Sequence, residues 1–426
     1  MKTFNYPSNW NALTERPSIQ TENLEAVVNN VLLAVKEEGD VAVKKYTKQF
    51  DQVNLEDFKV SEAEIEAAIA LVPNNLKEAI LQAKKNIEVF HSSQRESVQV
   101  VETMEGISCW RKSVAIDKVG LYIPAGTAPL FSTVLMLGVP AKLAGCQEIV
   151  LCSPPAKDGT INPVILYAAS LVGCTKIFKV GGVQAIGAMA YGTATVPKVY
   201  KIFGPGNQYV TCAKQIISQQ GLAIDMPAGP SELLVWADKT ANPVFVAADL
   251  LSQAEHGVDS QVVLVSDNAS VIDKVQAAIK RQIEGLPRKG IAQAALENSL
   301  AILLKTSNEI IEFINKYAPE HLILNVSNAE AIANKITNAG SVFLGNFTPE
   351  SLGDYASGTN HTLPTNGFAC NYSGVSLDSF VKKITFQKAN AQGLKNIGWA
   401  VELMAEAEQL EAHKNAVTIR LKSLEN

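Results

Sequence analysis

The stretch that decides the fold is DMPAGPSELLVWADKTANPVFVAADLLSQAEHG, residues 225–257. It combines a turn-rich loop, a short apolar run and a helical pattern. Asn242 and Pro243 are typical of a helix N-cap and a first helical residue, and Gly257 is typical of a stop. We therefore expect one helix over residues 244–256, directly after a strand.

One face of this expected helix is polar. Asp249, Gln253 and His256 are spaced i, i+4 and i+7, so they share one narrow stripe, and Gln253 and His256 could bind one ion. A solvated stripe with a histidine near the C-terminal end of the helix dipole explains the same spacing. On this segment alone, the solvated stripe is the better interpretation.

Outward from this stretch, short apolar runs alternate with helical patterns, as they do in βαβ units. Before it, the runs cover residues 119–123, 148–152, 176–180 and 199–203. From it onward, they cover residues 233–236, 261–266, 300–304, 321–325 and 341–344. The sequence therefore predicts an α/β protein with two Rossmann-like domains, each built on a parallel sheet.

The remaining segments set the expected domain boundaries. We expect a small N-terminal segment (1–20), a first α/β domain (21–118 with 233–375), an inserted nucleotide-binding α/β domain (119–232) and a C-terminal helical arm (376–426). The first domain opens with helices: Thr21 is a candidate N-cap, Gly39 a stop, and Ser61 with Glu64 a capping box. A polar connector over residues 389–398 precedes the amphipathic part of the arm.

The bulk composition is that of a globular protein with a small partner. The chain has 426 residues, 47% of them hydrophobic, which is enough for two or more cores. Lys and Arg number 37 against 42 Asp and Glu, a net charge of −5, which argues against nucleic acid or an anionic membrane as partner. Residues 1–20 have no apolar leader, and no run of about 18 apolar residues occurs, so we expect a cytoplasmic protein.

The apolar runs of the first set end in turns rich in glycine and proline. The last of these turns, Gly204-Pro205-Gly206-Asn207, follows an expected strand and precedes an expected helix, where open parallel sheets bind ligands. It lacks the third glycine of a dinucleotide fingerprint. A turn that only reverses the chain explains these glycines equally well.

Histidine is rare, and it stands beside other polar side chains. Of the five histidines, four have carboxylate or amide neighbours: His256 with Gln253 and Glu255, His321 with Glu320, His361 with Asp354 and Asn360, and His413 with Glu408 and Glu411. Two imidazoles, a carboxylate and an amide oxygen suit zinc, while a carboxylate next to an imidazole suits proton transfer. Each pair alone is commoner as surface decoration, but their joint occurrence favours a site. Residues 345–367 also form a loop too long to be idle.

Four segments closely resemble the signature motifs of the histidinol dehydrogenase family: IDMPAGPSELLV, ADLLSQAEHG, APEHL and ESLGDYASGTNHTLPT. The likeness extends from about Val27 to the C-terminal tail. The resemblance implies the oxidation of L-histidinol to L-histidine through the aldehyde, the last step of histidine biosynthesis. It also implies two NAD⁺ and one zinc ion per site in a homodimer.

The resemblance implies roles for individual residues as well. The implied zinc ligands are Gln253, His256, Asp354 and His413. The implied acid-base pair is Glu320 and His321. The implied substrate contacts are Ser231, His361 and Glu408, together with His321 and the zinc ligands. The implied NAD contacts are Tyr122, Gln184 and Asn207. The arm that carries Glu408 and His413 would complete the active site of the partner subunit.

The implied reaction has a physical logic. Oxidation of an alcohol needs a neutral base near the hydroxyl, as His321 could be, and oxidation of the aldehyde needs an activated water, which Glu320 could supply. Zinc would position the substrate. Three other functions remain open: a zinc hydrolase with the same ligands, an aldehyde dehydrogenase whose nucleophile would be Cys370, at a position where many relatives have arginine, and a two-domain binding protein without catalysis.

Overall fold

The computed structural model describes residues 1–17, 23–125, 129–227 and 229–425. It divides into two compact units, one made of residues 1–94 and 116–380 and the other of residues 95–115 and 381–426. The expected cap Thr21 lies outside the described residues. Among the described helices, none is both long and apolar enough to cross a membrane.

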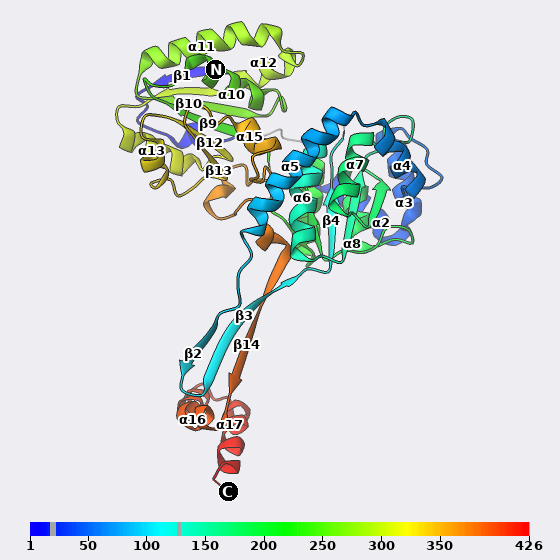
Figure 1. The fold of residues 1–426 in the computed structure, drawn as a ribbon, viewed down its shortest axis with the longest axis vertical. Coiled ribbons are helices and arrows are strands. Elements are labelled where there is room, and N and C mark those ends of the chain that lie inside the picture. Colours follow the sequence, from blue (N-terminus) through cyan, green and yellow to red (C-terminus); the bar gives the residue numbers. More distant parts are fainter. Residues whose placement is uncertain (18–22, 126–128, 228, 426) are drawn as a thin grey trace. The chain divides into compact units, whose positions relative to one another are not determined.

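The first unit contains a six-stranded parallel sheet in the order β1-β11-β10-β9-β12-β13 (Figure 1). Its strands are β1 (Lys2–Asn5), β9 (Glu232–Ala237), β10 (Gln261–Ser266), β11 (Leu300–Leu303), β12 (His321–Asn325) and β13 (Ser341–Leu344). Every neighbouring pair is parallel. The expected N-terminal segment is therefore partly an edge strand, because Lys2 to Asn5 pair with Leu300 to Leu303.

Apolar residues line both faces of this sheet, so helices cover both. One face packs against α10 (Pro243–Ala254), α11 (Ala269–Gln282) and α12 (Lys289–Glu297). The other packs against α1 (Asn11–Thr14), α13 (Ser307–Tyr317) and α14 (Ala329–Ala333). As expected, Asn242 caps α10 by accepting from the Val244 N–H (3.0 Å), and Pro243 is the first helical residue. The helix ends at Ala254, three residues before Gly257.

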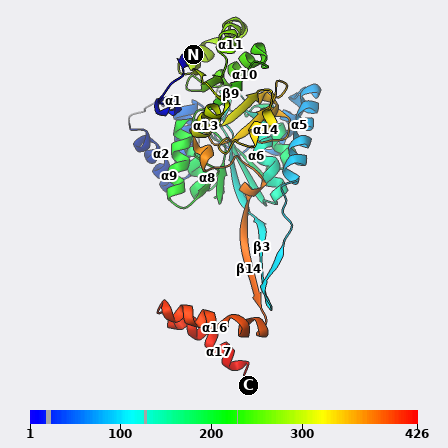
Figure 2. The same cartoon turned by 90° about the vertical axis from the view of Figure 1, so that its left-hand side faces the viewer.

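A second parallel sheet has the order β6-β5-β4-β7-β8. Its strands are β4 (Lys118–Tyr122), β5 (Glu148–Ser153), β6 (Lys176–Lys179), β7 (Lys201–Phe203) and β8 (Ala223–Ile224). The helices that follow its strands are α6 (Phe131–Ala144), α7 (Pro163–Val172), α8 (Gly182–Tyr191) and α9 (Gln208–Gln219). Figure 2 shows α8 and α9, two of the helices that belong to it, side by side. The two Rossmann-like sheets that the sequence predicts are thus confirmed.

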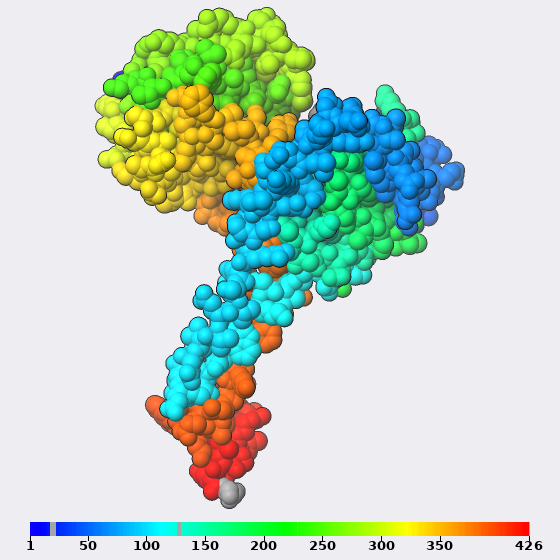
Figure 3. Space-filling view, in the orientation of Figure 1, coloured from blue at the N-terminus to red at the C-terminus, as the bar shows by residue number. Residues whose placement is uncertain are grey.

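The opening helices correct one expected domain boundary. These are α2 (Leu24–Glu38), α3 (Asp40–Tyr46), η1 (Thr47–Asp51), α4 (Glu62–Leu71) and α5 (Asn74–Ser92). Residues 21–118 were expected to join residues 233–375, but these helices share their apolar cores with α6 to α9 of the five-stranded sheet. Figure 3 shows α5 lying against this part of the chain. The expected capping box of Ser61 and Glu64 and the stop at Gly39 are both present.

The second unit is a three-stranded antiparallel sheet followed by two helices. Its strands are β2 (Val100–Met104), β3 (Ile107–Ala115) and β14 (Val381–Ala389), in the order β14-β3-β2. Helices α16 (Ala391–Ala407) and α17 (Glu411–Ser423) pack together where Gly398 leaves room for Leu421. The expected helical arm is thus correct for its end, but it begins with a strand, and the expected connector over 389–398 is mostly helix.

Candidate active site

The expected acid-base pair lies at the amino end of β12. The preceding turn is tight, since Ala318 has a φ of 50° and Gly340 leaves no room for a Cβ beside the Glu320 carbonyl. Glu320 and His321 are 5% and 4% exposed. Glu320 Oε2 accepts from the Glu232 N–H (2.9 Å) and lies 3.6 Å from His321 Nδ1. The pair is therefore buried and held by the neighbouring strand β9.

Two further carboxyl groups reach His321 from the helix α15 (Glu350–Tyr355). Glu350 Oε1 lies 3.6 Å from His321 Nδ1, and Asp354 Oδ1 lies 3.5 Å from His321 Nε2. His321, Glu350 and Asp354 each offer a ligand atom, and these atoms lie within 4.8 Å of one another. The sequence reasoning found Asp354 but missed Glu350, although their i, i+4 spacing places both on one face of a helix.

The pKa values of the groups in this cluster are shifted in different directions. Burial alone would lower the pKa of His321, but Glu350 and Glu320 outweigh it and raise this pKa well above its ordinary value. Burial raises the pKa of Glu350 well above its ordinary value, whereas His321 lowers the pKa of Asp354 despite burial. The cluster therefore favours an imidazolium beside ionised Asp354 and a protonated Glu350.

The C-terminal end of α10 supplies Gln253 and His256. Gln253 is 1% exposed, and neither atom of its amide has a hydrogen-bond partner among the described residues. His256 follows the helix end and is exposed, and its charge acts on Asp354. An unpaired buried amide is costly, so Gln253 is suited to a ligand that supplies the missing partner.

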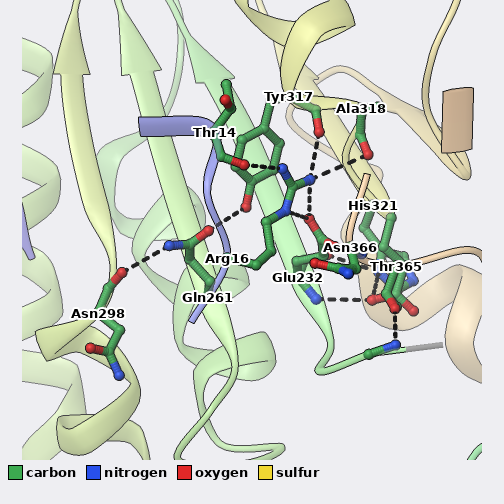
Figure 4. A network of polar contacts seen from close by, with 12 residues as sticks. Thr14, Arg16, Glu232, Gln261, Asn298, Tyr317, Ala318, His321, Thr365 and Asn366 are labelled. Carbon is green, nitrogen blue, oxygen red and sulfur yellow. Dashed lines mark hydrogen bonds and ion pairs between the residues drawn. The ribbon is translucent and has the colours of Figure 1, made fainter. Parts of the chain in front are cut away.

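His361 and Ser231 lie around the same cluster. His361 Nδ1 is 2.8 Å from the Asp354 carbonyl oxygen, and its Nε2 is 3.0 Å from Thr133 Oγ1 of α6. Burial lowers the pKa of His361, which favours the neutral imidazole. Ser231 directly precedes β9, and its carbonyl accepts from the Gln261 N–H (3.2 Å). Figure 4 shows the polar network around Glu232 beside His321.

The chemistry of part of the expected site suits a cation. Carboxylate and imidazole groups converge at His321, Glu350 and Asp354, and both the Gln253 amide and Glu350 Oε2 lack hydrogen-bond partners within the described residues. Glu408 and His413 lie in the other compact unit, at the end of α16 and in the first turn of α17, and both are exposed. The roles of these two residues stay predictions.

The three expected NAD contacts lie at the carboxyl ends of the five-stranded sheet. Tyr122 ends β4, and its hydroxyl accepts from the Gly182 N–H at the start of α8 (3.1 Å). Gln184 is fully buried in the first turn of α8, with its Oε1 unpaired within the described residues. Asn207 caps α9 by accepting from the Tyr209 and Val210 N–H groups, both at 3.1 Å. This edge is where open parallel sheets bind nucleotides.

The glycines of the turn after β7 have structural reasons of their own. Gly204 has a φ of 128°, and a Cβ there would lie 2.0 Å from the Tyr122 carbonyl oxygen. A Cβ on Gly206 would lie 2.4 Å from a methyl group of Val210. Close packing within the turn thus explains both glycines, so their spacing is not itself evidence of a nucleotide.

Comparison with known proteins gives one consistent answer. A family model described as histidinol dehydrogenase matches residues 14–421. A histidinol dehydrogenase from Bacteroides thetaiotaomicron is 61% identical over 426 residues, covering 100% of both chains. A chloroplastic histidinol dehydrogenase from Arabidopsis thaliana is 53% identical over 417 residues, covering 97% of this chain and 89% of its own.

A solved structure agrees with these relatives. The crystal structure of histidinol dehydrogenase from Elizabethkingia anophelis is 58% identical and superposes with a TM-score of 0.98, covering 100% of this chain and 99% of the other. These matches cover the chain over all or nearly all of its length. The chain therefore belongs to the histidinol dehydrogenase family of enzymes.

Proposed function

We propose that the protein oxidises L-histidinol to L-histidine through the aldehyde, as the last step of histidine biosynthesis, with NAD⁺ as hydride acceptor and a bound zinc ion. The family supports the overall reaction. The observation that carries the proposal is the cluster of the buried residues Glu320 and His321 with the half-buried Asp354, because alcohol oxidation and aldehyde hydration both need positioned proton acceptors.

His321 and Glu320 divide the proton transfers between them. In the first oxidation, His321 would accept the hydroxyl proton of the alcohol. In the second, Glu320 would remove a proton from the water that adds to the aldehyde, while His321 returns its proton to the aldehyde oxygen; the neutral His321 can then accept a proton from the hydrate. NAD⁺, when bound, would accept the hydride lost in each oxidation. Burial of both residues at 5% and 4% exposure keeps bulk water away from these transfers.

Gln253, His256 and Asp354, with His413 from the C-terminal arm, would hold the zinc ion. When bound, the ion would position the imidazole and amine of the substrate, and its charge would favour the neutral, proton-accepting form of His321. Glu350 is an alternative ligand, since it stands in the cluster of possible metal-binding groups with His321 and Asp354. A set that used His321 as a ligand would remove the base, so we favour the first set.

The substrate and cofactor contacts follow the same assignment. Ser231 and His361 flank the cluster, and Glu408 of the arm would approach from outside. Tyr122, Gln184 and Asn207 would contact NAD at the carboxyl edge of the five-stranded sheet. The N-termini of α8 and α9 lie at this edge, and helix N-termini favour the negative charge of a pyrophosphate.

The protein is further proposed to be a cytoplasmic homodimer in which the arm of one subunit completes the site of the other. The exposure of large apolar side chains on α16 supports a protein partner: Trp399, Leu403 and Met404 are 63%, 58% and 66% exposed. A second copy of the chain that packed on α16 would remove these side chains from water.

One assay tests the reaction. Purified protein is mixed with histidinol and NAD⁺, NADH is followed by absorbance, and histidine is identified as the product. We expect two NADH per histidine and loss of activity with a chelator that is reversed by zinc. Hydrolysis of other substrates without NADH would indicate a zinc hydrolase. Full activity in Cys370→Ser, which alters an exposed thiol, would exclude the thiol nucleophile of an aldehyde dehydrogenase.

A hybrid dimer tests the shared site. Chains with His413→Ala and chains with Glu320→Gln are denatured and refolded together, and hybrids are confirmed by mass. If the arm acts on the partner, one site of each hybrid carries both changes and the other carries neither, so activity returns. If the arm acts on its own subunit, every site keeps one change and the hybrids stay as impaired as their parents.

A further inference from the structure

A buried ion pair joins the N-terminal segment to strand β9. The side chains of Arg16 and Glu232 are 8% and 1% exposed. Arg16 Nε and Nη2 both donate to Glu232 Oε2, at 2.8 and 2.5 Å. The same guanidinium donates to the carbonyls of Thr14 and Tyr317 and lies 3.5 Å above the Tyr317 ring. Arg16 is therefore held in one place and one orientation (Figure 4).

Glu232 connects this ion pair to both residues of the acid-base pair. Its backbone N–H donates to Glu320 Oε2 (2.9 Å), and its carbonyl oxygen lies 3.4 Å from His321 Nδ1. Its second carboxylate oxygen accepts from the Asn366 N–H. The contacts of the Glu232 side chain thus hold in place the Glu232 backbone N–H, which donates to the Glu320 carboxylate.

The charges of Glu232 and Glu320 oppose each other. Burial raises the pKa of Glu232, and the negative charge of Glu320 raises it further, while Arg16 lowers it. Both carboxyl groups are buried, so an uncompensated Glu232 would repel the Glu320 side chain from its position. Arg16 neutralises Glu232 in a region that solvent does not reach. Removing Arg16 would leave an unpaired charge in a medium of low polarity.

We propose that Arg16 is a positioning residue of the reaction, which holds Glu320 in place for the step that activates water by neutralising and anchoring Glu232. This inference rests on the proposed function, in which Glu320 acts on the aldehyde stage. An alternative explanation is that Arg16 only anchors the N-terminal segment to the sheet. Such an anchor would affect stability and both oxidation steps alike.

The test separates the two oxidation steps in Arg16→Gln. Histidinal oxidation is measured at saturating NAD⁺, and the first hydride transfer is measured as single-turnover NADH formation from histidinol. We expect histidinal oxidation to fall about ten- to a hundredfold, because small displacements of a catalytic group cost on that order, while the first transfer changes much less. An equal fall in both rates would overturn the inference.

Three companion variants make the result specific. Arg16→Gln combined with Glu232→Gln leaves a neutral, hydrogen-bonded pair of similar shape, and should recover most of the histidinal rate. A double variant no faster than Arg16→Gln would contradict a role for charge. Tyr317→Phe removes the hydroxyl that donates to Gln261 (2.7 Å) but changes no charge, and should lower stability without changing the ratio of the two rates. Should Arg16→Gln not fold, Arg16→Lys keeps the charge without the guanidinium fork, and should lower stability with a smaller change in that ratio.

The wild type and Glu320→Gln are measured alongside. A wild type that oxidises neither substrate would end the proposed function. If the wild type is active and Glu320→Gln is selectively slow on histidinal, but Arg16→Gln leaves the ratio of rates unchanged, only the role of Arg16 fails.

Discussion

The two parallel sheets share an architecture but present their polar residues at opposite edges. In the six-stranded sheet, Glu320, His321 and Ser231 lie at the amino ends of β12 and β9. In the five-stranded sheet, Tyr122 and Asn207 lie at or just beyond the carboxyl ends of β4 and β7. The site residues expected at the first edge include buried charged groups, and those expected at the second edge are neutral; we call these the charged edge and the neutral edge. The neutral edge also holds a buried ion pair, since Lys214 and Asp225 contact each other and the Gly204 backbone there. Either edge of a parallel sheet can therefore carry a site, and the side chains at each edge determine which kind of ligand it can bind.

The directions of the helices explain why the two edges suit different ligands. A helix that returns along a sheet ends near the amino ends of the strands, so the C-terminus of α10, with Gln253, meets the charged edge. Helices begin near the carboxyl ends, so the N-termini of α8 and α9 meet the neutral edge. Helix C-termini favour cations and N-termini favour anions. The amino edge thus suits a metal ion and an imidazolium, and the carboxyl edge suits a dinucleotide.

The most severe way to break this comparison is to remove the base from the charged edge. We expect His321→Asn to lower the rates of both oxidation steps by roughly 10²- to 10⁴-fold, the usual effect of losing a positioned base. Steady-state rates with histidinol and with histidinal measure it. Glu255→Gln, a nearby change outside the cluster, is the control. A loss under tenfold in both steps would mean that this edge does not perform the proton transfers.

Glu320→Gln separates the two steps at the same edge. We expect the rate with histidinal to fall by about 10²-fold or more, because the aldehyde must gain an activated water, while the first hydride transfer from histidinol is retained within a few fold. Single-turnover kinetics with each substrate provide the comparison. Equal losses with both substrates would sink the division of labour between Glu320 and His321.

Metal content distinguishes the two possible ligand sets at the charged edge. Elemental analysis of the wild type should give about one zinc per chain. His256→Ala should lose most of the zinc. Glu350→Gln should keep it if Glu350 contacts His321 but does not bind zinc. The opposite pattern would assign the ion to the set of His321, Glu350 and Asp354.

Gly204→Ala tests the neutral edge alone. The new Cβ would lie 2.0 Å from the Tyr122 carbonyl oxygen at a φ of 128°, so we expect a loss of unfolding free energy. A strained φ costs about 1–3 kcal/mol before the clash is counted. Gly221→Ala is the matched control, since Gly221 has a φ of 95° but nothing within 4 Å of the added atom. The KM for NAD⁺ should rise in Gly204→Ala while zinc content stays unchanged, and a joint loss of both would argue against separate edges.

The smallest effect concerns Asp51, which accepts from Gln184 Nε2 (3.4 Å). Burial raises the pKa of Asp51 to about 6. Its protonated form is therefore favoured in the folded state, and the stability that it contributes below pH 4 is lost as the pH rises through 6. Because the side chain keeps some contact with water, Asp51→Asn should be more stable than the wild type by only about 1 kcal/mol above pH 6. Denaturant midpoints at pH 4 and pH 8 measure the difference, and an equal shift at both would exclude the titration of Asp51.

Most strands of the two sheets could be predicted from the sequence, because buried parallel strands are continuous apolar runs bounded by turns. The pairing of β1 could not, since a four-residue edge strand carries little pattern and its partner lies 298 positions away. Of the opening helices, α2 and α4 were identified from their cap and stop signals, but an amphipathic helix does not show in its sequence which sheet it covers. The strands β2, β3 and β14 were not predicted because their residues are exposed or half-buried, so they give no continuous apolar run.

The candidate site shows the same limits. Histidine scarcity and the resemblance selected Glu320, His321 and Asp354, and these residues do meet. Glu350 was missed because nothing in the local sequence distinguishes it from other glutamates. Only the fold shows that α15 places its carboxylate beside His321. Arg16 was missed for a similar reason, since its partner Glu232 lies 216 positions away and nothing local marks either residue as buried.

The place of β1 in its sheet has a consequence for how the protein is made. The five-stranded sheet and its helices come almost wholly from residues 24–224, so this part can collapse while the ribosome is still adding later segments. Strand β1 must instead wait for β11, which at typical synthesis speeds takes roughly 15 to 60 s to follow. Until then, Phe4 has no strand partner, and the Arg16 guanidinium must likewise wait for Glu232 and then Tyr317, so residues made early are among the last to find their place.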